Sequence, residues 1–135
     1  MNKTHIFNMK IPLYEVDIGG GVYHGNYYHL FELARESMFE DIGFTYSEMM
    51  DCGNHLAVAE ARCTYRKPLR YNEAITISSK IIQISSRSLK IDQEIRNKNN
   101  EELTTVLHLH LVCINHEGRA AILPQKLKEA IELRG

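Results

Sequence analysis

In one segment of this chain the apolar residues recur with the period of a helix, and this segment limits the folds that the rest of the chain can adopt. Its apolar residues recur at three- and four-residue spacings and are Tyr27, Leu30, Phe31, Ala34, Met38 and Ile42. This spacing places them on one stripe of a helix, which must be buried against another element. Gly25-Asn26 offers an N-cap before the segment, and Gly43 stands where a helix C′ residue is expected. The sequence therefore predicts one long helix with a single buried face.

Most of the other segments alternate apolar and polar residues, as half-buried strands do. A first strand is predicted to end near Tyr14, with Pro12 indicating an edge position or a bulge. Four later strands are predicted over residues 55–66, 74–84, 89–96 and 103–114. Short helices are predicted to start at the capping box Thr45-x-x-Glu48 and at Pro124. A strand, a long helix and four successive strands predict an α+β fold, with the helix packed on an antiparallel sheet.

On one face of the predicted strand over residues 55–66 all the side chains are small. Under regular alternation this face is formed by Ala57, Ala59, Ala61 and Cys63. Side chains of this size let a helix lie very close to a sheet. We therefore expect this surface to face the long helix.

Length, charge and cysteine content narrow the class of protein. The 135 residues fit one domain, 1–135, with enough chain for a hydrophobic core. A net charge of −1 gives no electrostatic reason to expect a nucleic acid or a membrane as partner. We expect neither a membrane-spanning segment nor a signal peptide. Three widely spaced cysteines, Cys52, Cys63 and Cys113, are expected to be reduced thiols of a cytoplasmic protein.

The stretch from Glu15 to Tyr27 combines a carboxylate, three consecutive glycines, a histidine and the start of the long helix. Glycines permit positive φ angles and a close approach of the backbone to another group. Main-chain amides at a helix start lack acceptors and carry partial positive charge. The stretch is therefore expected to direct the Asp17 carboxylate and the positive end of the helix at the same space. Such a site suits a polarised oxygen.

The run Asp17-x-x-Gly20-x-x-Tyr23-His24-x-Asn26-Tyr27, followed by Glu32-x-Ala34-Arg35, resembles the signature of hotdog-fold acyl-CoA thioesterases. The most similar branch is the 4-hydroxybenzoyl-CoA thioesterase or YbgC-like family. The segment that leads into Tyr65-Arg66-Lys67-Pro68-Leu69-Arg70 also resembles the second strand and Lys-Pro turn of that family. The resemblance implies a hotdog fold, a five-stranded antiparallel sheet wrapped around one long central helix. It also implies hydrolysis of a small to medium, or aromatic, acyl-CoA to free acid and CoA.

The resemblance assigns roles to the residues of the glycine-rich stretch. It implies that Asp17 acts on the thioester carbonyl, either as a nucleophile or as a base that activates water. On the sequence alone, Asp17 can also be a turn or capping residue. The amide of His24, with Gly25 and Asn26 next to it, would stabilise the oxyanion. The His24 imidazole can orient Asp17 or the water, or merely bind loop carbonyls.

The expected substrate contacts are made by Tyr23, Asn26, Tyr27, Arg66, Lys67, Arg87 and Ser88. The basic residues among them, together with Arg62 and Arg70, suit a nucleotide phosphate. No metal and no cofactor are expected, since coenzyme A is part of the substrate, and acyl carrier protein stays open as an alternative carrier. The active form is expected to be a homodimer or homotetramer with sites at the subunit interface, because a five-stranded sheet has unprotected edges.

Two positions depart from the resembled family. YbgC-like members tend to place a tyrosine four residues before the aspartate, whereas this chain has Leu13 there and Tyr14 one place later. On a strand this shift moves the phenol to the opposite face, so Tyr14 is not expected in the site unless a bulge resets the phase. Gly21 replaces a bulkier apolar residue, which widens the pocket or loosens the loop.

Other polar residues have plainer explanations. His108 and His110 share a strand face at a spacing that a metal would accept, but without further ligands they are expected to face solvent or an interface. Glu32, Glu36 and Glu40 recur at four-residue intervals and are expected on a solvated or dimer-facing edge of the helix, with Glu36 kept as a remote catalytic candidate.

Two other functions stay open. One is a hotdog hydratase or dehydratase, in which His24 and a carboxylate would transfer protons. The other is a non-catalytic protein that binds acyl thioesters of CoA or acyl carrier protein. Release of free CoA would distinguish the hydrolase from both.

Overall fold

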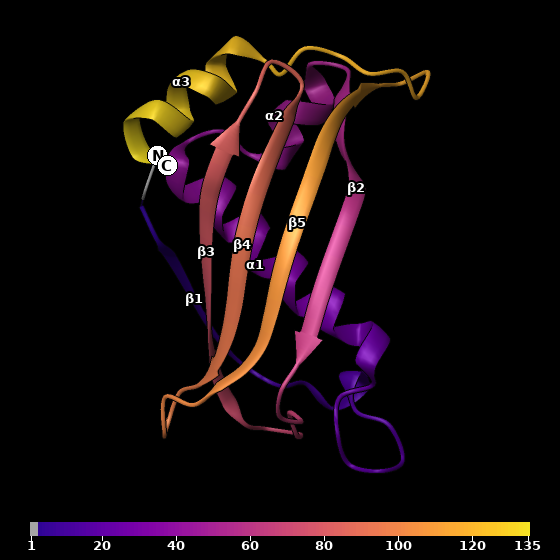
Figure 1. The fold of residues 1–135 in the computed structure, drawn as a ribbon, viewed down its shortest axis with the longest axis vertical. Coiled ribbons are helices and arrows are strands. Elements are labelled where there is room, and N and C mark those ends of the chain that lie inside the picture. The colour runs from indigo at the N-terminus through magenta and orange to yellow at the C-terminus, as the bar shows by residue number, and fades with distance from the viewer. Residues whose placement is uncertain (1–2) are drawn as a thin grey trace.

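A computed structural model describes residues 3–135, in which a five-stranded antiparallel sheet curves around one long helix, α1 (Figure 1). The strands lie in the order β1-β3-β4-β5-β2. Their bounds are His5–Lys10 for β1, Asn54–Tyr65 for β2, Ala74–Ile84 for β3, Ser88–Asn97 for β4 and Leu103–Asn115 for β5. The α-helices are α1 (Tyr27–Ile42), α2 (Tyr46–Asp51) and α3 (Gln125–Arg134). The predicted α+β architecture and the order of its elements are confirmed.

Both ends of α1 were predicted, and one of them differs in detail. Gly43 ends the helix in the left-handed conformation, with φ +88°, as expected for a C′ glycine. The prediction that Asn26 caps the start is wrong, because its backbone is already helical and its side chain makes no capping bond. A 3₁₀ turn, η2 (His24–Asn26), leads into α1 instead. The Thr45 cap of α2 is confirmed, since the Glu48 amide donates to its hydroxyl.

The first strand is shorter than predicted. It ends at Lys10, not near Tyr14, and a second 3₁₀ turn, η1 (Leu13–Glu15), follows Pro12. Proline donates no main-chain hydrogen bond, which is consistent with its position just past the end of an edge strand. The strand-phase argument for Tyr14 therefore does not apply, because Tyr14 lies in a 3₁₀ turn.

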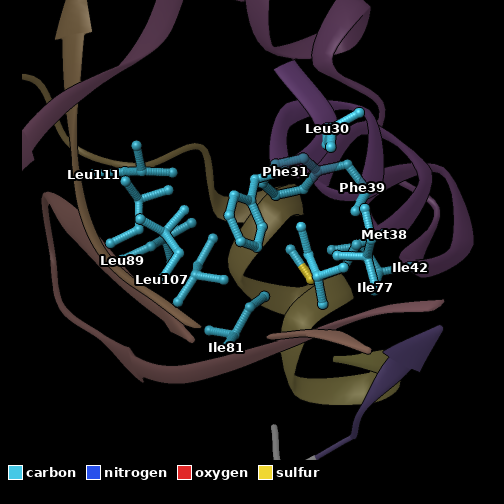
Figure 2. Close-up of a cluster of buried hydrophobic side chains, with 14 of the residues drawn as sticks. Leu30, Phe31, Met38, Phe39, Ile42, Ile77, Ile81, Leu89, Leu107 and Leu111 are labelled. Carbon is cyan, nitrogen blue, oxygen red and sulfur yellow. The ribbon is translucent and has the colours of Figure 1, made fainter. Parts of the chain in front are cut away.

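The core lies between the inner face of the sheet and the buried stripe of α1 (Figure 2). Phe31, Met38 and Ile42 contribute from the helix, and isoleucines and leucines contribute from β3, β4 and β5. Gln93 and Ser79 form a polar pair within this apolar layer. Buried Gln93 donates to the Phe31 carbonyl at 3.0 Å and to the Ser79 hydroxyl at 2.9 Å. Because each of these buried polar atoms has a partner, the pair ties the middle of α1 to the sheet without an unmet hydrogen bond.

A β-bulge at Ala59 changes which side chains of β2 face the helix. Val58 pairs with Leu111 and Ala61 with Leu109 on the inner face, whereas Ala57 pairs with Val112 on the outer face. The predicted common face of Ala57, Ala59, Ala61 and Cys63 is therefore wrong, because the extra residue reverses the alternation. The backbone of α1 comes nearest to β1 and β3 rather than to β2. Within residues 3–135, none of the helices combines the length and apolar character needed to cross a bilayer.

A buried histidine makes the stability of the fold depend on pH. His5 of β1 is 5% exposed, its Nδ1 lies 3.8 Å from Asp41 Oδ2, and its Nε2 has no hydrogen-bond partner within residues 3–135. Burial, aided by Lys3 and opposed by Asp41, lowers the pKa of His5 below its ordinary value. The unfolded chain therefore takes up this proton more readily than the folded chain. Stability should fall as the pH drops below about 6.5, the unfolded value.

Replacing His5 with phenylalanine should make this pH dependence weaker. We expect the urea midpoint of the wild type to fall more between pH 7 and pH 5.5 than that of His5→Phe. Other groups titrate in both proteins, so the difference between the two curves is the measured quantity. Parallel curves would contradict the assignment.

Candidate active site

The glycine-rich loop is closed by a short pairing of Val16 with Val22. Inside it, the Asp17 amide donates to the Gly21 carbonyl at 3.0 Å, and the Gly20 amide donates to the Asp17 carbonyl at 3.0 Å. Gly20 has φ +86°, a conformation that side chains other than glycine rarely adopt. The loop is thus a tight turn whose backbone conformation requires glycine at one position.

The Asp17 side chain has two distinct oxygens in this turn. Oδ1 accepts the Gly19 amide at 2.9 Å, which is the turn role that the sequence allowed. Within residues 3–135 no group donates to Oδ2, and the residue is exposed. Asp17 therefore stabilises its own loop with one oxygen and presents the other to the surroundings.

The start of α1 presents main-chain amides beyond this loop. His24 and Gly25 open the helical run, where amides have no intrahelical acceptor. The His24 ring packs against Tyr23, with ring centroids 4.4 Å apart. A Cβ on Gly25 would lie 2.9 Å from the Tyr23 ring, so this position needs glycine for the ring to stay in place. These two amides and the exposed Tyr23 and His24 side chains form the second part of the candidate site.

Two tyrosine hydroxyls fix the start of α1. Tyr65 of β2 donates to the His24 carbonyl at 2.9 Å, and Tyr27 accepts the Leu69 amide at 3.2 Å. Burial raises the pKa of both phenols, so both stay protonated near neutral pH. Tyr27 is 3% exposed, so its place in the structure is in the core, and its predicted contact with substrate stays a prediction. The hydrogen bond of Tyr65 was not foreseen, because the two residues it joins are far apart in the sequence.

The structure also joins two residues that sequence reasoning did not pair, Glu15 and His29. Glu15 is 4% exposed, and both of its carboxylate oxygens lie close to His29 Nδ1, at 3.1 and 3.3 Å. The Glu15 carbonyl accepts the Tyr23 amide at 3.1 Å and the Asn26 side-chain amide at 3.2 Å. The sequence offered only a weak signal, an acidic residue two places before Asp17 and a histidine outside the apolar stripe of α1.

The predicted phosphate-binding cations divide between the two ends of the sheet. Arg66 and Lys67 lie just past β2, near Tyr65, and Lys67 Nζ is 2.5 Å from Glu102. The main chain of Arg70 pairs with that of Gly21 in an isolated antiparallel β-bridge, and the Arg70 guanidinium lies beside Gly20.

Arg87 and Ser88 lie at the opposite end of the strands, in and after the turn between β3 and β4 (Figure 1). Ser88 pairs with Val112, which in turn pairs with Ala57 near the start of β2. One chain therefore does not bring Arg87 and Ser88 to its own glycine loop, and their predicted role requires a second subunit.

Three hollows among residues 3–135 lie beside α1 or on the outer face of the sheet. One of about 390 Å³ is lined by Tyr14, Glu15, His29, Leu30, Glu32, Leu33 and Glu36. A smaller one of about 170 Å³ lies between α1, α2 and β2. A third, of about 430 Å³, includes His108 and His110 on the outer face, where His108 pairs with Asp92 at 2.8 Å. Among residues 3–135, no three potential metal ligands are grouped so as to hold an ion.

Comparison with known proteins gives consistent matches over nearly the whole chain. A model of the thioesterase-like superfamily matches residues 11–131. The acyl-CoA thioester hydrolase YbgC of Escherichia coli is 29% identical over 117 residues, covering 85% of this chain and 86% of that protein. The DHNA-CoA thioesterase structure from Staphylococcus aureus aligns with TM-score 0.89 at 27% identity, covering 96% and 89% of the two chains. A 1,4-dihydroxy-2-naphthoyl-CoA thioesterase from Synechocystis has the same fold, with TM-score 0.87 at 24% identity and 96% coverage of both chains.

Proposed function

This chain belongs to the thioesterase-like superfamily and has the hotdog fold, and we propose that it hydrolyses small to medium or aromatic acyl-CoA thioesters to free acid and CoA. The observation that carries the proposal is the free oxygen of the exposed Asp17 carboxylate, on a loop that leads into α1. The Escherichia coli relative is an acyl-CoA thioester hydrolase, and the Staphylococcus aureus structure is a DHNA-CoA thioesterase. These relatives support CoA thioesters, including aromatic ones, as the proposed substrates of this chain.

In the proposed reaction, Asp17 acts at the thioester carbonyl carbon. As a base it would take a proton from the attacking water, and as a nucleophile it would form an anhydride that water then hydrolyses. The carbon–sulfur bond breaks in either route, and the departing thiolate takes up a proton to give CoA. The amides of His24 and Gly25 would bind the carbonyl oxygen as it becomes negative. Coenzyme A belongs to the substrate, and we propose that no separate cofactor takes part.

We propose the cytoplasm as the location, which the three unpaired cysteines support. Acyl carrier protein is the alternative carrier, because its pantetheine arm matches that of CoA. The two carriers differ in everything beyond that arm, so a direct comparison of their esters decides between them.

The experiment that tests the function is a panel of acyl thioesters read by thiol release. The panel should include acetyl-, hexanoyl-, benzoyl- and naphthoyl-CoA and one enoyl-CoA, together with hexanoyl acyl carrier protein. Turnover with free thiol as product supports the proposal. Loss of enoyl-CoA absorbance without thiol release would instead support a hydratase, and saturable binding without any reaction would support a binding protein.

We further propose that the active form is at least a homodimer whose sites combine residues of two chains. The strand β2 forms one edge of the sheet, so its outer main-chain groups have no neighbouring strand among residues 3–135, although the Leu56 amide donates to the Tyr46 hydroxyl at 3.1 Å. Apolar side chains are also exposed along it, with Val58 57% and Tyr65 44% exposed. A second subunit at this edge would also bring another copy of Arg87 and Ser88 towards the glycine loop.

Hybrid dimers test the shared site. We expect that mixing Asp17→Asn subunits with Gly25→Pro subunits restores activity that neither variant has alone. In the proposed dimer the helix start of one chain meets the Asp17 carboxylate of the other, so one of the two sites in a hybrid receives both parts intact. Subunit exchange should be confirmed by mass spectrometry and oligomeric state by light scattering. An active monomer, or exchanged and folded hybrids without recovery, would refute the shared site.

The role of the His24 side chain is tested by the pH dependence of kcat/KM. We expect His24→Ala to shift or abolish the acid limb of the profile, because imidazole groups titrate near neutral pH. If only the main-chain amide acts, the variant should keep both its activity and the wild-type profile. Identical profiles for the two proteins would therefore refute participation of the ring.

A further inference from the structure

The contacts of Glu15 set it apart from the other acidic residues near the site. Its side chain is 5% exposed, and within residues 3–135 His29 is the side chain that binds its carboxylate. Burying an ionised carboxylate without a partner is strongly unfavourable, so this contact offsets a substantial penalty. His29 itself is 63% exposed and lies in the first turn of α1. The pair therefore links a buried loop residue to the start of the helix.

The main chain of Glu15 holds the same part of the site from the other side. Its carbonyl accepts the Tyr23 amide and the Asn26 side-chain amide, and these two residues flank His24 and Gly25. Glu15 thus contacts both sides of the turn that presents the free amides. A change in the position of Glu15 would shift that turn.

We propose that Glu15 and His29 are positioning residues, which hold the His24–Gly25 amides in the geometry needed for oxyanion binding. This inference rests on the proposed thioesterase function. Neither side chain is assigned a contact with the substrate, and both act through the turn. Errors of about 1 Å in the position of a catalytic group can cost on the order of a hundredfold in rate, so a loosened turn should be visible in kcat.

The expected result for His29→Ala is a fall in kcat of about tenfold or more, with KM changed less than about twofold. The carboxylate loses its partner, moves towards solvent and draws the Glu15 backbone with it. His29→Asn should restore most of kcat, because the asparagine amide nitrogen can occupy the place of Nδ1. His29→Gln should restore less, because its amide corresponds to Nε2. If His29→Asn and His29→Gln both had the same low kcat as His29→Ala, the proposal would be overturned.

A double variant gives a second and sharper test. Glu15→Gln removes the charge whose burial needs His29 but keeps the main-chain carbonyl. Glu15→Gln/His29→Ala should therefore have a higher kcat than His29→Ala alone, a coupling that two independent residues would not show. If the losses of kcat from the two substitutions were additive, Glu15 and His29 would not act as a pair and the proposal would be overturned. Glu40→Ala, an exposed position of the same helix, serves as the matched control and should keep wild-type kcat.

Amide exchange separates failure of this inference from failure of the proposed function. The Tyr23 amide donates to the Glu15 carbonyl, so its exchange should be at least about tenfold faster in His29→Ala than in the wild type. If the wild type releases no CoA from any ester, the thioesterase proposal fails, and the exchange rates still decide whether His29 holds the turn. If the wild type is active while kcat and exchange are unchanged in His29→Ala, the positioning role is wrong.

Discussion

Replacing Asp17 with asparagine is expected to lower kcat by at least about a hundredfold, as loss of a base or nucleophile does. Asparagine keeps the size of the side chain, and its oxygen can still accept the Gly19 amide that closes the turn. The substitution therefore removes the charge and leaves the loop intact. Thiol release from the best ester of the panel measures the effect.

A comparison with Asp17→Ala separates chemistry from loop structure. Alanine removes both the charge and the bond to Gly19, so this variant should lose loop order as well as activity. Circular dichroism and thermal melting should show that Asp17→Asn is folded like the wild type. A folded Asp17→Asn protein with wild-type kcat would remove Asp17 from the mechanism.

Truncating Phe31 to alanine is expected to have the largest effect on stability, a loss of about 3–5 kcal/mol. Phe31 has no exposed surface, and Figure 2 shows its ring between α1 and the leucines of β4 and β5. The loss combines the transfer free energy of the ring with the cavity left behind. Urea unfolding at pH 7, with the midpoint and slope fitted together, measures it.

Leu33 is the matched control on the same helix. It is 39% exposed, so Leu33→Ala should cost about 1 kcal/mol or less. Equal losses at the two positions would mean that α1 is not buried along the stripe on which the fold depends. That result would contradict the packing of α1 against the inner face of the sheet.

The fold was predictable from the sequence wherever one local pattern decides the structure. The helix over 27–42 followed from its single apolar stripe and from Gly43, and the structure gives the same bounds. The β2 face was mispredicted because a single extra residue at Ala59 reverses the alternation, and no local pattern indicated it. The early end of β1 was missed because alternation continues past Lys10 in the sequence although the strand does not.

The loop that carries the candidate site could be predicted from the sequence, but the side-chain contacts within the site could not. Asp17 and His24 were identified through a motif, and their catalytic roles stay predictions. The hydrogen bond from Tyr65 to His24 and the pairing of Glu15 with His29 join residues 41 and 14 positions apart. Such contacts depend on how β2 and the turn that holds Glu15 pack against the start of α1, which no local pattern encodes. The separation of Arg87 from the glycine loop likewise follows from the topology of the sheet.

The two tyrosine hydroxyls at the start of α1 hold one part of the candidate site to the rest of the fold. Tyr65 holds the His24 carbonyl, and Tyr27 holds Leu69, whose own carbonyl accepts the Val22 amide. Residues 17–21 are held mainly by the bonds of their own turn and by the bridge to Arg70. In the proposed mechanism we therefore expect entry of substrate and departure of acid to displace the Asp17 turn rather than the start of α1. The His24–Gly25 amides would then keep their position between cycles, so that each new carbonyl oxygen would meet donors already in place.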